Sequence, residues 1–374
     1  MIHQQRRAEQ EDHGGGERSG STSRPFHDSE YSYTRANRAH PWIPRGRALL
    51  LVAGVAAVIL MVAVTGVETL LTPLGMLSWH LAILILVPGL LLELAHTVAW
   101  RLAFVGPRVS PGRLFAVRLA GEAVNFGGVS VAGEPLKVYL LRPSVSVMDA
   151  AVAQIVDKTS VTAAQVLFLA VGLLIVRDVA LPADFVRAMT VLLGAQVLVV
   201  GGFVVVQCVE LGDGALGLLA RFGLETRGGR DSTIRRFGRV LGAFYRERFT
   251  RVLACTGVHL LGWLAGGLEV YLMLRWLDVN TSLTTALALD AFGTGIRFLA
   301  FAIPGALGVL EGGYMAVFAI FGVGGGLGLS FSLVRRLRML AWAAAGLVIL
   351  ATLLESRLSF VARRSPGFPA RRRS

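Results

Sequence analysis

Four long runs without a charged residue constrain this sequence more than any other feature. The runs cover 48–67, 159–176, 188–209 and 312–334. Each reaches the roughly 18 apolar residues that mark a candidate membrane-spanning helix. Soluble proteins are about one-quarter charged, whereas 16% of these residues are charged and 54% are hydrophobic. The sequence therefore predicts an all-α, polytopic integral membrane helical bundle.

The predicted transmembrane domain covers residues 45–358 and holds about six to eight spans. From 283 to 358 the sequence stays apolar but is interrupted by Pro304 and the glycine-rich 322–328. This pattern predicts two full spans plus either two more spans or a pair of half-helices. The remaining full spans are predicted at 47–67, 79–101, 149–176, 186–208 and 251–274.

The net charge of +13 is concentrated outside the predicted spans. Residues 1–44 are polar and predict a disordered tail, 359–374 form a basic tail, and 210–250 contains a basic amphipathic segment. Basic residues also gather in 101–148, Arg118 and Lys137 among them. Because cytoplasmic loops are rich in Lys and Arg, we expect these regions and both termini on the cytoplasmic side of a bacterial inner membrane. This placement argues against a nucleic-acid partner.

Ionisable side chains at membrane depth are the second informative feature. Each costs several kcal/mol there unless it is paired or hydrated. Glu93 and His96 share one helix face because they are three residues apart. Any single pair could serve structure alone, but together the charges predict a polar cavity inside the bundle. The others are Asp157, Lys158, Asp290, Arg297, Glu311, Arg335, Arg336 and Arg338.

Two segments combine small residues with one glutamate: "VAGEPLKVYLL", which contains Glu134, and "GVLEGGYMAVF", which contains Glu311. Interrupted helices are tolerated at membrane depth only against protein or a water-filled cavity, and a pair of them is typical of a transporter's binding site. We expect a half-helix to begin just before Glu311 and the site to lie between the two segments. The predicted backbone breaks are Gly133, Pro135, Pro304, Gly305, Gly308 and Gly312.

Motifs of known enzyme chemistry are missing from the sequence. It contains no HExxH, no P-loop and no H-x4-D acyltransferase signature. The segment "KVYLLRP" lacks the spacing and the histidines of lipid phosphatases. Cys208 and Cys255 have no metal-like spacing. The sequence therefore favours a protein without catalytic residues, metal or cofactor.

The two glutamate segments resemble motifs of the lysylphosphatidylglycerol synthase transmembrane region family, also called the flippase-like domain family. Its members carry G-E-x-x-[KR]-x-x-L-L in the first half and P-G-x-L-G-x-x-E in the second. The form "EAVN…GEPLK" is similar to the hopanoid-biosynthesis-associated branch. The resemblance covers roughly 47–355. The matching residues are Gly133, Glu134, Lys137, Leu140 and Leu141, then Pro304, Gly305, Gly308 and Glu311.

This resemblance implies a protein that binds or translocates membrane lipids or lipid-linked substrates. Full-length lysylphosphatidylglycerol synthases carry a soluble aminoacyl-transfer domain after the membrane region. The present sequence ends shortly after its last predicted span, so we expect no synthesis of a lysyl-lipid. The family's usual proline ahead of the first motif is replaced by "NFGGVSVAGE", which leaves the shape of that break open.

The charges suggest how a lipid site could work. Cations suit an anionic headgroup, while carboxylates would pair with them or bind an amine. One alternative is an accessory protein that scaffolds lipid-biosynthesis enzymes through its basic surface, and another is a membrane-embedded lipid transferase. The candidate substrate-binding residues are Asn125, Glu134, Lys137, Arg142, Asp157, Lys158, Arg297, Glu311 and Arg335.

Overall fold

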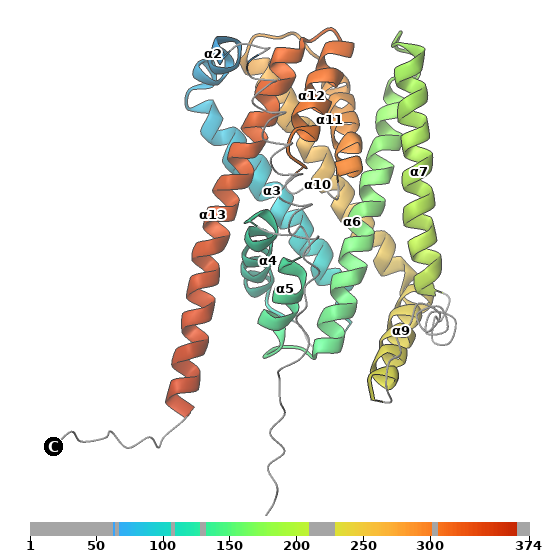
Figure 1. Ribbon diagram of the computed structural model, residues 1–374, viewed down its shortest axis with the longest axis vertical. Helices are drawn as coiled ribbons and strands as arrows, with labels where there is room; N and C mark the ends of the chain where they lie inside the picture. Colours follow the sequence, from blue (N-terminus) through green and yellow to red (C-terminus); the bar gives the residue numbers. More distant parts are fainter. Residues whose placement is uncertain are drawn as a thin grey trace, which may run out of the picture. The chain divides into compact units, whose positions relative to one another are not determined.

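The computed structural model describes residues 63, 67–105, 109–127, 132–208, 229–300 and 306–364. Within these residues every regular element is a helix (Figure 1), which confirms the all-α prediction. The predicted tail 1–44, most of the span 47–67 and the predicted breaks at Pro304 and Gly305 lie outside the described residues.

Five helices of the described residues are long and apolar enough to cross a membrane. They are α3 (His80–Ala103), α6 (Val147–Ile175), α7 (Ala183–Cys208), α10 (Phe249–Trp276) and α13 (Gly325–Arg364). The first four coincide with the spans predicted at 79–101, 149–176, 186–208 and 251–274. The protein is therefore a polytopic helical membrane protein, as its apolar runs predict.

Two further pairs of helices are too short to cross a bilayer, given a rise of about 1.5 Å per residue against a core of about 30 Å. The first hairpin consists of α4 (Pro111–Gly127) and α5 (Gly133–Leu141). The second hairpin consists of α11 (Leu283–Arg297), which ends in a 3₁₀ turn (Phe298–Ala300), and α12 (Val309–Ile320). The pair of half-helices predicted for 283–358 is therefore correct, but the two full spans predicted beside it are not. The described residues there hold one full span, α13, because the charge-free run 312–334 is divided between α12 and α13.

The two hairpins enter the bundle from opposite ends. The first hairpin connects the end of α3 to the start of α6, and the second connects the end of α10 to the start of α13. Figure 1 shows α4 and α5 in the lower half of the bundle and α11 and α12 in the upper half.

The first hairpin buries two of its basic residues. The charge pattern predicts that the segment 101–148 lies on the cytoplasmic side, and within it Arg118 and Lys137 are buried at 5% and 0% exposure. The reason is that α4 packs against α3 and α13 while α5 packs against α6, so these cations face the protein interior.

Helix starts follow local side-chain chemistry. Ser146 caps α6 by accepting a hydrogen bond from the Asp149 amide at 3.0 Å. Gly308, with φ of +80°, precedes α12, a backbone conformation that glycine adopts without strain. Glu311 lies in the first turn of α12, and Glu134 lies in the first turn of α5. The predicted half-helix that begins just before Glu311 is thus confirmed.

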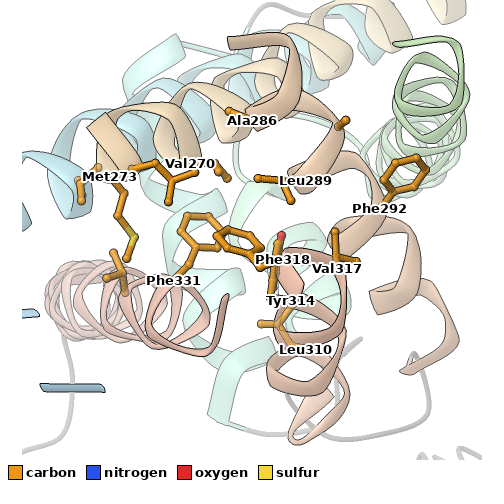
Figure 2. Close-up of a cluster of buried hydrophobic side chains, with 14 of the residues drawn as sticks. Val270, Met273, Ala286, Leu289, Phe292, Leu310, Tyr314, Val317, Phe318 and Phe331 are labelled. Carbon is orange, nitrogen blue, oxygen red and sulfur yellow. The ribbon is translucent and has the colours of Figure 1, made fainter. Parts of the chain in front are cut away.

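Each hairpin has its own apolar core. Figure 2 shows side chains of α10, α11, α12 and α13 converging around Tyr314, Phe318 and Phe331. A second cluster surrounds the first hairpin and includes Leu114 and Leu140. The two shorter helices outside the hairpins are α2 (Val67–Leu77) and α9 (Gly229–Glu247). α9 falls within the basic amphipathic segment predicted at 210–250.

Candidate functional site

A cavity of about 390 Å³ lies inside the bundle and is lined by residues of both halves of the chain. Its volume falls within the range of about 300–1,000 Å³ that is usual for small-molecule sites. Its cationic lining residues are Arg118, Lys158, Arg297, Arg335 and Arg338, and its carboxylates are Glu93 and Glu122. Apolar lining comes from residues that include Leu92, Val161, Trp263, Leu310, Met339 and Trp342.

At the first hairpin, two carboxylates share two lysines. Glu122 Oε1 lies 2.6 Å from Lys137 Nζ and 3.5 Å from Lys158 Nζ. Glu134 Oε1 lies 3.0 Å from Lys158 Nζ and accepts a hydrogen bond from Asn125 Nδ2 at 2.8 Å. Four of the predicted site residues therefore meet in one network.

The tip of the first hairpin is closed by backbone contact. Asn125 Oδ1 accepts a hydrogen bond from the Gly133 amide at 2.7 Å. A Cβ atom on Gly133 would lie 1.9 Å from the carbonyl oxygen of Gly121, so α5 begins directly against α4. The residues 128–131 between α4 and α5, where the family's usual proline is replaced, lie outside the described residues.

Arg118 connects the first hairpin to α3 and α6. Its Nε lies 2.9 Å from Glu93 Oε2, and its Nη1 lies 3.6 Å from Asp157 Oδ2. The other oxygen of Asp157, Oδ1, lies 3.1 Å from His259 Nε2 on α10. A cavity-lining cation is thereby held by carboxylates of two neighbouring helices.

At the second hairpin, Arg335 of α13 contacts three partners. Its Nη2 lies 2.8 Å from Asp290 Oδ1, and its Nε lies 3.2 Å from Glu269 Oε2. Its Nη1 also donates a hydrogen bond to the Tyr314 hydroxyl, which in turn donates to Asp290 Oδ1 at 2.7 Å. Arg338 pairs with Glu269 as well. Arginine suits this role because its planar guanidinium offers several fixed donors.

Glu311 joins the tip of the second hairpin to α13. Its Oε2 accepts the Gly308 amide at 2.8 Å, and its Oε1 lies 2.7 Å from Arg336 Nε. The side chain is 1% exposed, and of the residues of α12 it is Leu310, not Glu311, that lines the cavity. Glu311 therefore stabilises the start of α12 against α13 without lining the cavity itself.

The predicted site residues divide into three groups by position. Asn125, Lys158, Arg297 and Arg335 line the cavity, whereas Glu134, Lys137, Asp157 and Glu311 lie behind the lining. Arg142 does neither, because it is exposed and its guanidinium stacks 4.1 Å from the centroid of the Tyr139 ring. Pro135 and Gly312 lie in the first turns of α5 and α12.

Several residues of these networks are absent from the predicted site set. His259 and Glu269 were detectable, since both are ionisable residues within the predicted span 251–274 and such residues mark functional candidates. Glu122 shares a helix face with Arg118 and Asn125 by its spacing of four and three residues. Tyr314 carries no charge, and no pattern in the sequence singles it out.

The described residues contain no group of three or more His, Cys, Asp or Glu side chains that could hold a metal ion. The charged clusters above instead join opposite charges. Their carboxylates contact lysine, arginine or histidine nitrogens at ion-pair distance.

Comparison with known families assigns the chain to one of them. Residues 48–348 match the family model described as "Lysylphosphatidylglycerol synthase TM region". Because the match covers most of the chain, including both hairpins, the protein belongs to this family, as its motifs predict. Neither a curated protein nor a solved structure matches the chain. Family and fold together identify a lipid-related membrane protein, while the narrower hopanoid-associated branch stays a prediction.

Proposed function

We propose that this protein binds an anionic membrane lipid by its headgroup in the cavity between the hairpins and moves it across the bacterial inner membrane. The observation that carries the proposal is the charge of the cavity, whose lining holds five cationic side chains and two carboxylates. A cation at membrane depth is costly without a partner, so a lining cation that no carboxylate neutralises favours an anionic ligand.

Arg297 is the residue best suited to hold that ligand. Each of the other four cationic lining residues pairs with a carboxylate: Arg118 with Glu93, Lys158 with Glu134, Arg335 with Asp290 and Arg338 with Glu269. Within the described part of the chain, no carboxylate lies at ion-pair distance from Arg297. Its guanidinium fork fits a phosphate group with two parallel hydrogen bonds.

The apolar part of the lining suits the rest of a lipid. Trp263, Met339 and Trp342 lie on the same cavity as the cations. The outer surfaces of α3 and α13 expose further leucines, among them Leu91 and Leu340. A headgroup in the cavity would thus leave its acyl chains beside apolar surface.

The arrangement of the hairpins supports movement across the membrane. Substrate sites of many transporters lie near the bilayer midplane, between discontinuous helices of two halves. The cavity here is lined from the first hairpin by Glu122 and from the second by Arg297 and Leu310. Shifts of the hairpins would expose the cavity to one side or the other.

The predicted orientation would place the mouth of the first hairpin in the cytoplasm. Basic α9 and the carboxyl end of α13 lie at the same end of the bundle as that mouth (Figure 1). Arg235, Arg239 and Arg246 of α9 are exposed. Clusters of Lys and Arg favour the cytoplasmic face, and the same face carries anionic lipids that attract them.

Purified protein in liposomes tests the proposal. The probes are fluorescent phosphatidylglycerol and phosphatidylcholine, and the measurement is the rate at which each becomes accessible to an external quencher. We expect faster exchange of phosphatidylglycerol, a loss of about tenfold in Arg297→Gln and partial retention in Arg297→Lys, because one charge-assisted hydrogen bond contributes about 1.5–3 kcal/mol. Arg177→Gln, at an exposed ion pair with Asp178, is the control. Exchange no faster than in protein-free liposomes would contradict the proposal.

A further inference from the structure

A chain of hydrogen bonds leads from the cavity into the bundle. His96 of α3 lines the cavity, and its Nδ1 lies 2.6 Å from Nδ1 of His259 on α10. The Nε2 of His259 lies 3.1 Å from Asp157 Oδ1 on α6. His259 and Asp157 are 0% and 1% exposed. Three helices thus contribute one continuous path of titratable groups.

The geometry fixes where hydrogens lie. Two imidazole nitrogens at hydrogen-bond distance hold one hydrogen between them, since one must donate and the other accept. In the neutral state His96 Nδ1 donates to His259, and His259 Nε2 donates to Asp157. No described residue is hydrogen-bonded to His96 Nε2, the nitrogen left over on the cavity-lining ring. That atom is the point where a proton can enter.

We infer that His96, His259 and Asp157 form a proton relay that takes up one proton when an anionic lipid headgroup occupies the cavity. A proton enters at Nε2 of His96, and the hydrogen on Nδ1 of His96 passes to Nδ1 of His259. His96 is then neutral again, and the gained charge resides on His259, whose imidazolium is held by the Asp157 carboxylate. Histidine is suited to such a step because it titrates near neutral pH.

Charged groups on several helices determine how readily this relay takes up a proton. Protonation is opposed by cations and favoured by carboxylates, so an entering phosphate shifts the balance towards the protonated state. Lipid and proton must then bind cooperatively, each to the same extent for the other. The groups that face the relay or share its cavity are Glu93 on α3, Arg118 and Glu122 on α4, Asp157 and Lys158 on α6, Arg297 on α11, and Arg335 and Arg338 on α13.

This inference rests on the proposed function and adds an energy source to it, since a proton bound with the lipid would allow the proton gradient to drive transport. The direct test is calorimetry of the full-length protein in detergent with dioctanoyl phosphatidylglycerol, repeated in buffers of different ionisation enthalpy. That lipid is a phosphodiester, which does not itself titrate near neutral pH. We expect net uptake approaching one proton per bound lipid near pH 7, and affinity that rises by up to about tenfold per pH unit as the pH falls from about 8 to about 6.

Histidine variants assign the effect. His96→Gln and His259→Gln should bind the lipid with little proton uptake and with affinity nearly independent of pH. His80→Gln is the matched control, because His80 stacks on Trp79 and lies tilted against Trp276, outside the cavity lining, and it should behave like the wild type. If a glutamine variant fails to fold, the proton count of the wild type decides.

The outcomes separate the two proposals. Lipid binding without proton uptake in the wild type would overturn the relay and leave the proposed function intact, as would uptake that persists in both glutamine variants. Absence of lipid binding at every pH would instead contradict the proposed function itself.

Discussion

Both hairpins have charged side chains inside the bundle, but these charges are paired in different ways. Around the first hairpin, cations from α4, α5 and the neighbouring α6 share carboxylates, and part of the network is open, with Lys158 and Glu122 at 40% and 32% side-chain exposure. Around the second hairpin the paired cations all come from the neighbouring α13, and their carboxylates, Glu269, Asp290 and Glu311, are at most 1% exposed.

This difference suggests that the two networks have different roles. Buried arginine pairs with fixed geometry hold the second hairpin against α10 and α13. Lysines shared between carboxylates can change partners with little loss, because two acceptors, on Glu122 and Glu134, lie within 3.5 Å of Lys158 Nζ. We therefore expect damage to the second network to unfold the protein, and damage to the open part of the first to weaken ligand binding while the fold persists.

The largest effect is expected from Asp290→Ala. Removal of one partner of a buried ion pair leaves Arg335 and the Tyr314 hydroxyl without their shared acceptor, which should lower the free energy of unfolding by about 3–5 kcal/mol. Thermal unfolding in detergent measures the loss. Asp184→Ala, at a carboxylate 93% exposed, should change the stability by less than about 1 kcal/mol. Equal effects of the two variants would refute the structural role of the second network.

Glu311→Gln should have the next largest effect. The amide oxygen can still accept the Gly308 N–H, but the charge that pairs with Arg336 is lost, at a cost of about 1.5–3 kcal/mol. Because Leu310 and Arg297 line the cavity from this hairpin, lipid exchange should slow as well. A variant that moves labelled lipid in proteoliposomes at the wild-type rate would remove Glu311 from the mechanism.

Gly133→Ala probes the backbone contact of the first hairpin. The added Cβ would lie 1.9 Å from the Gly121 carbonyl oxygen, so α5 must shift, and overpacking of this kind costs about 1–3 kcal/mol. Gly112→Ala on α4 is the matched control, since a Cβ there meets nothing within 4 Å. Wild-type stability in Gly133→Ala would show that the tip is looser than its contacts indicate.

The smallest effect on stability is expected from Lys158→Gln. Because the side chain is 40% exposed, the loss should stay below about 1 kcal/mol. Affinity for phosphatidylglycerol should nevertheless fall by about threefold to tenfold, as measured by calorimetry. Arg187→Gln, at an exposed pair on α7, should change neither quantity. Strong unfolding of Lys158→Gln would erase the contrast between the hairpins.

The spans α6 and α7 were predictable because a long charge-free apolar run favours a continuous helix in a bilayer. The charge-free run 312–334 is the exception, since the glycine-rich 322–328 divides it between α12 and α13. The start of α12 was also predictable, since Gly308 and Glu311 combine a permissive backbone with a carboxylate for the first turn. In both cases the deciding interactions are local in sequence.

The partners of the charges were not predictable. Arg118 has the same chemistry as a loop arginine, and only the packing of α4 against α3 and α13 turns it inward. Arg142 fits an anion site by type, yet it follows α5 on the exposed side. Contacts such as His259 with Asp157 join residues 102 positions apart, and no local pattern records such a distance.

The most direct test of the central claim, that the cavity between the hairpins holds an anionic headgroup, is native mass spectrometry of lipids bound to the purified protein and to Arg297→Gln. We expect the wild type to retain anionic phospholipids in preference to zwitterionic ones and the variant to lose this preference while remaining folded. The same ratio of anionic to zwitterionic lipid in both proteins would contradict the claim.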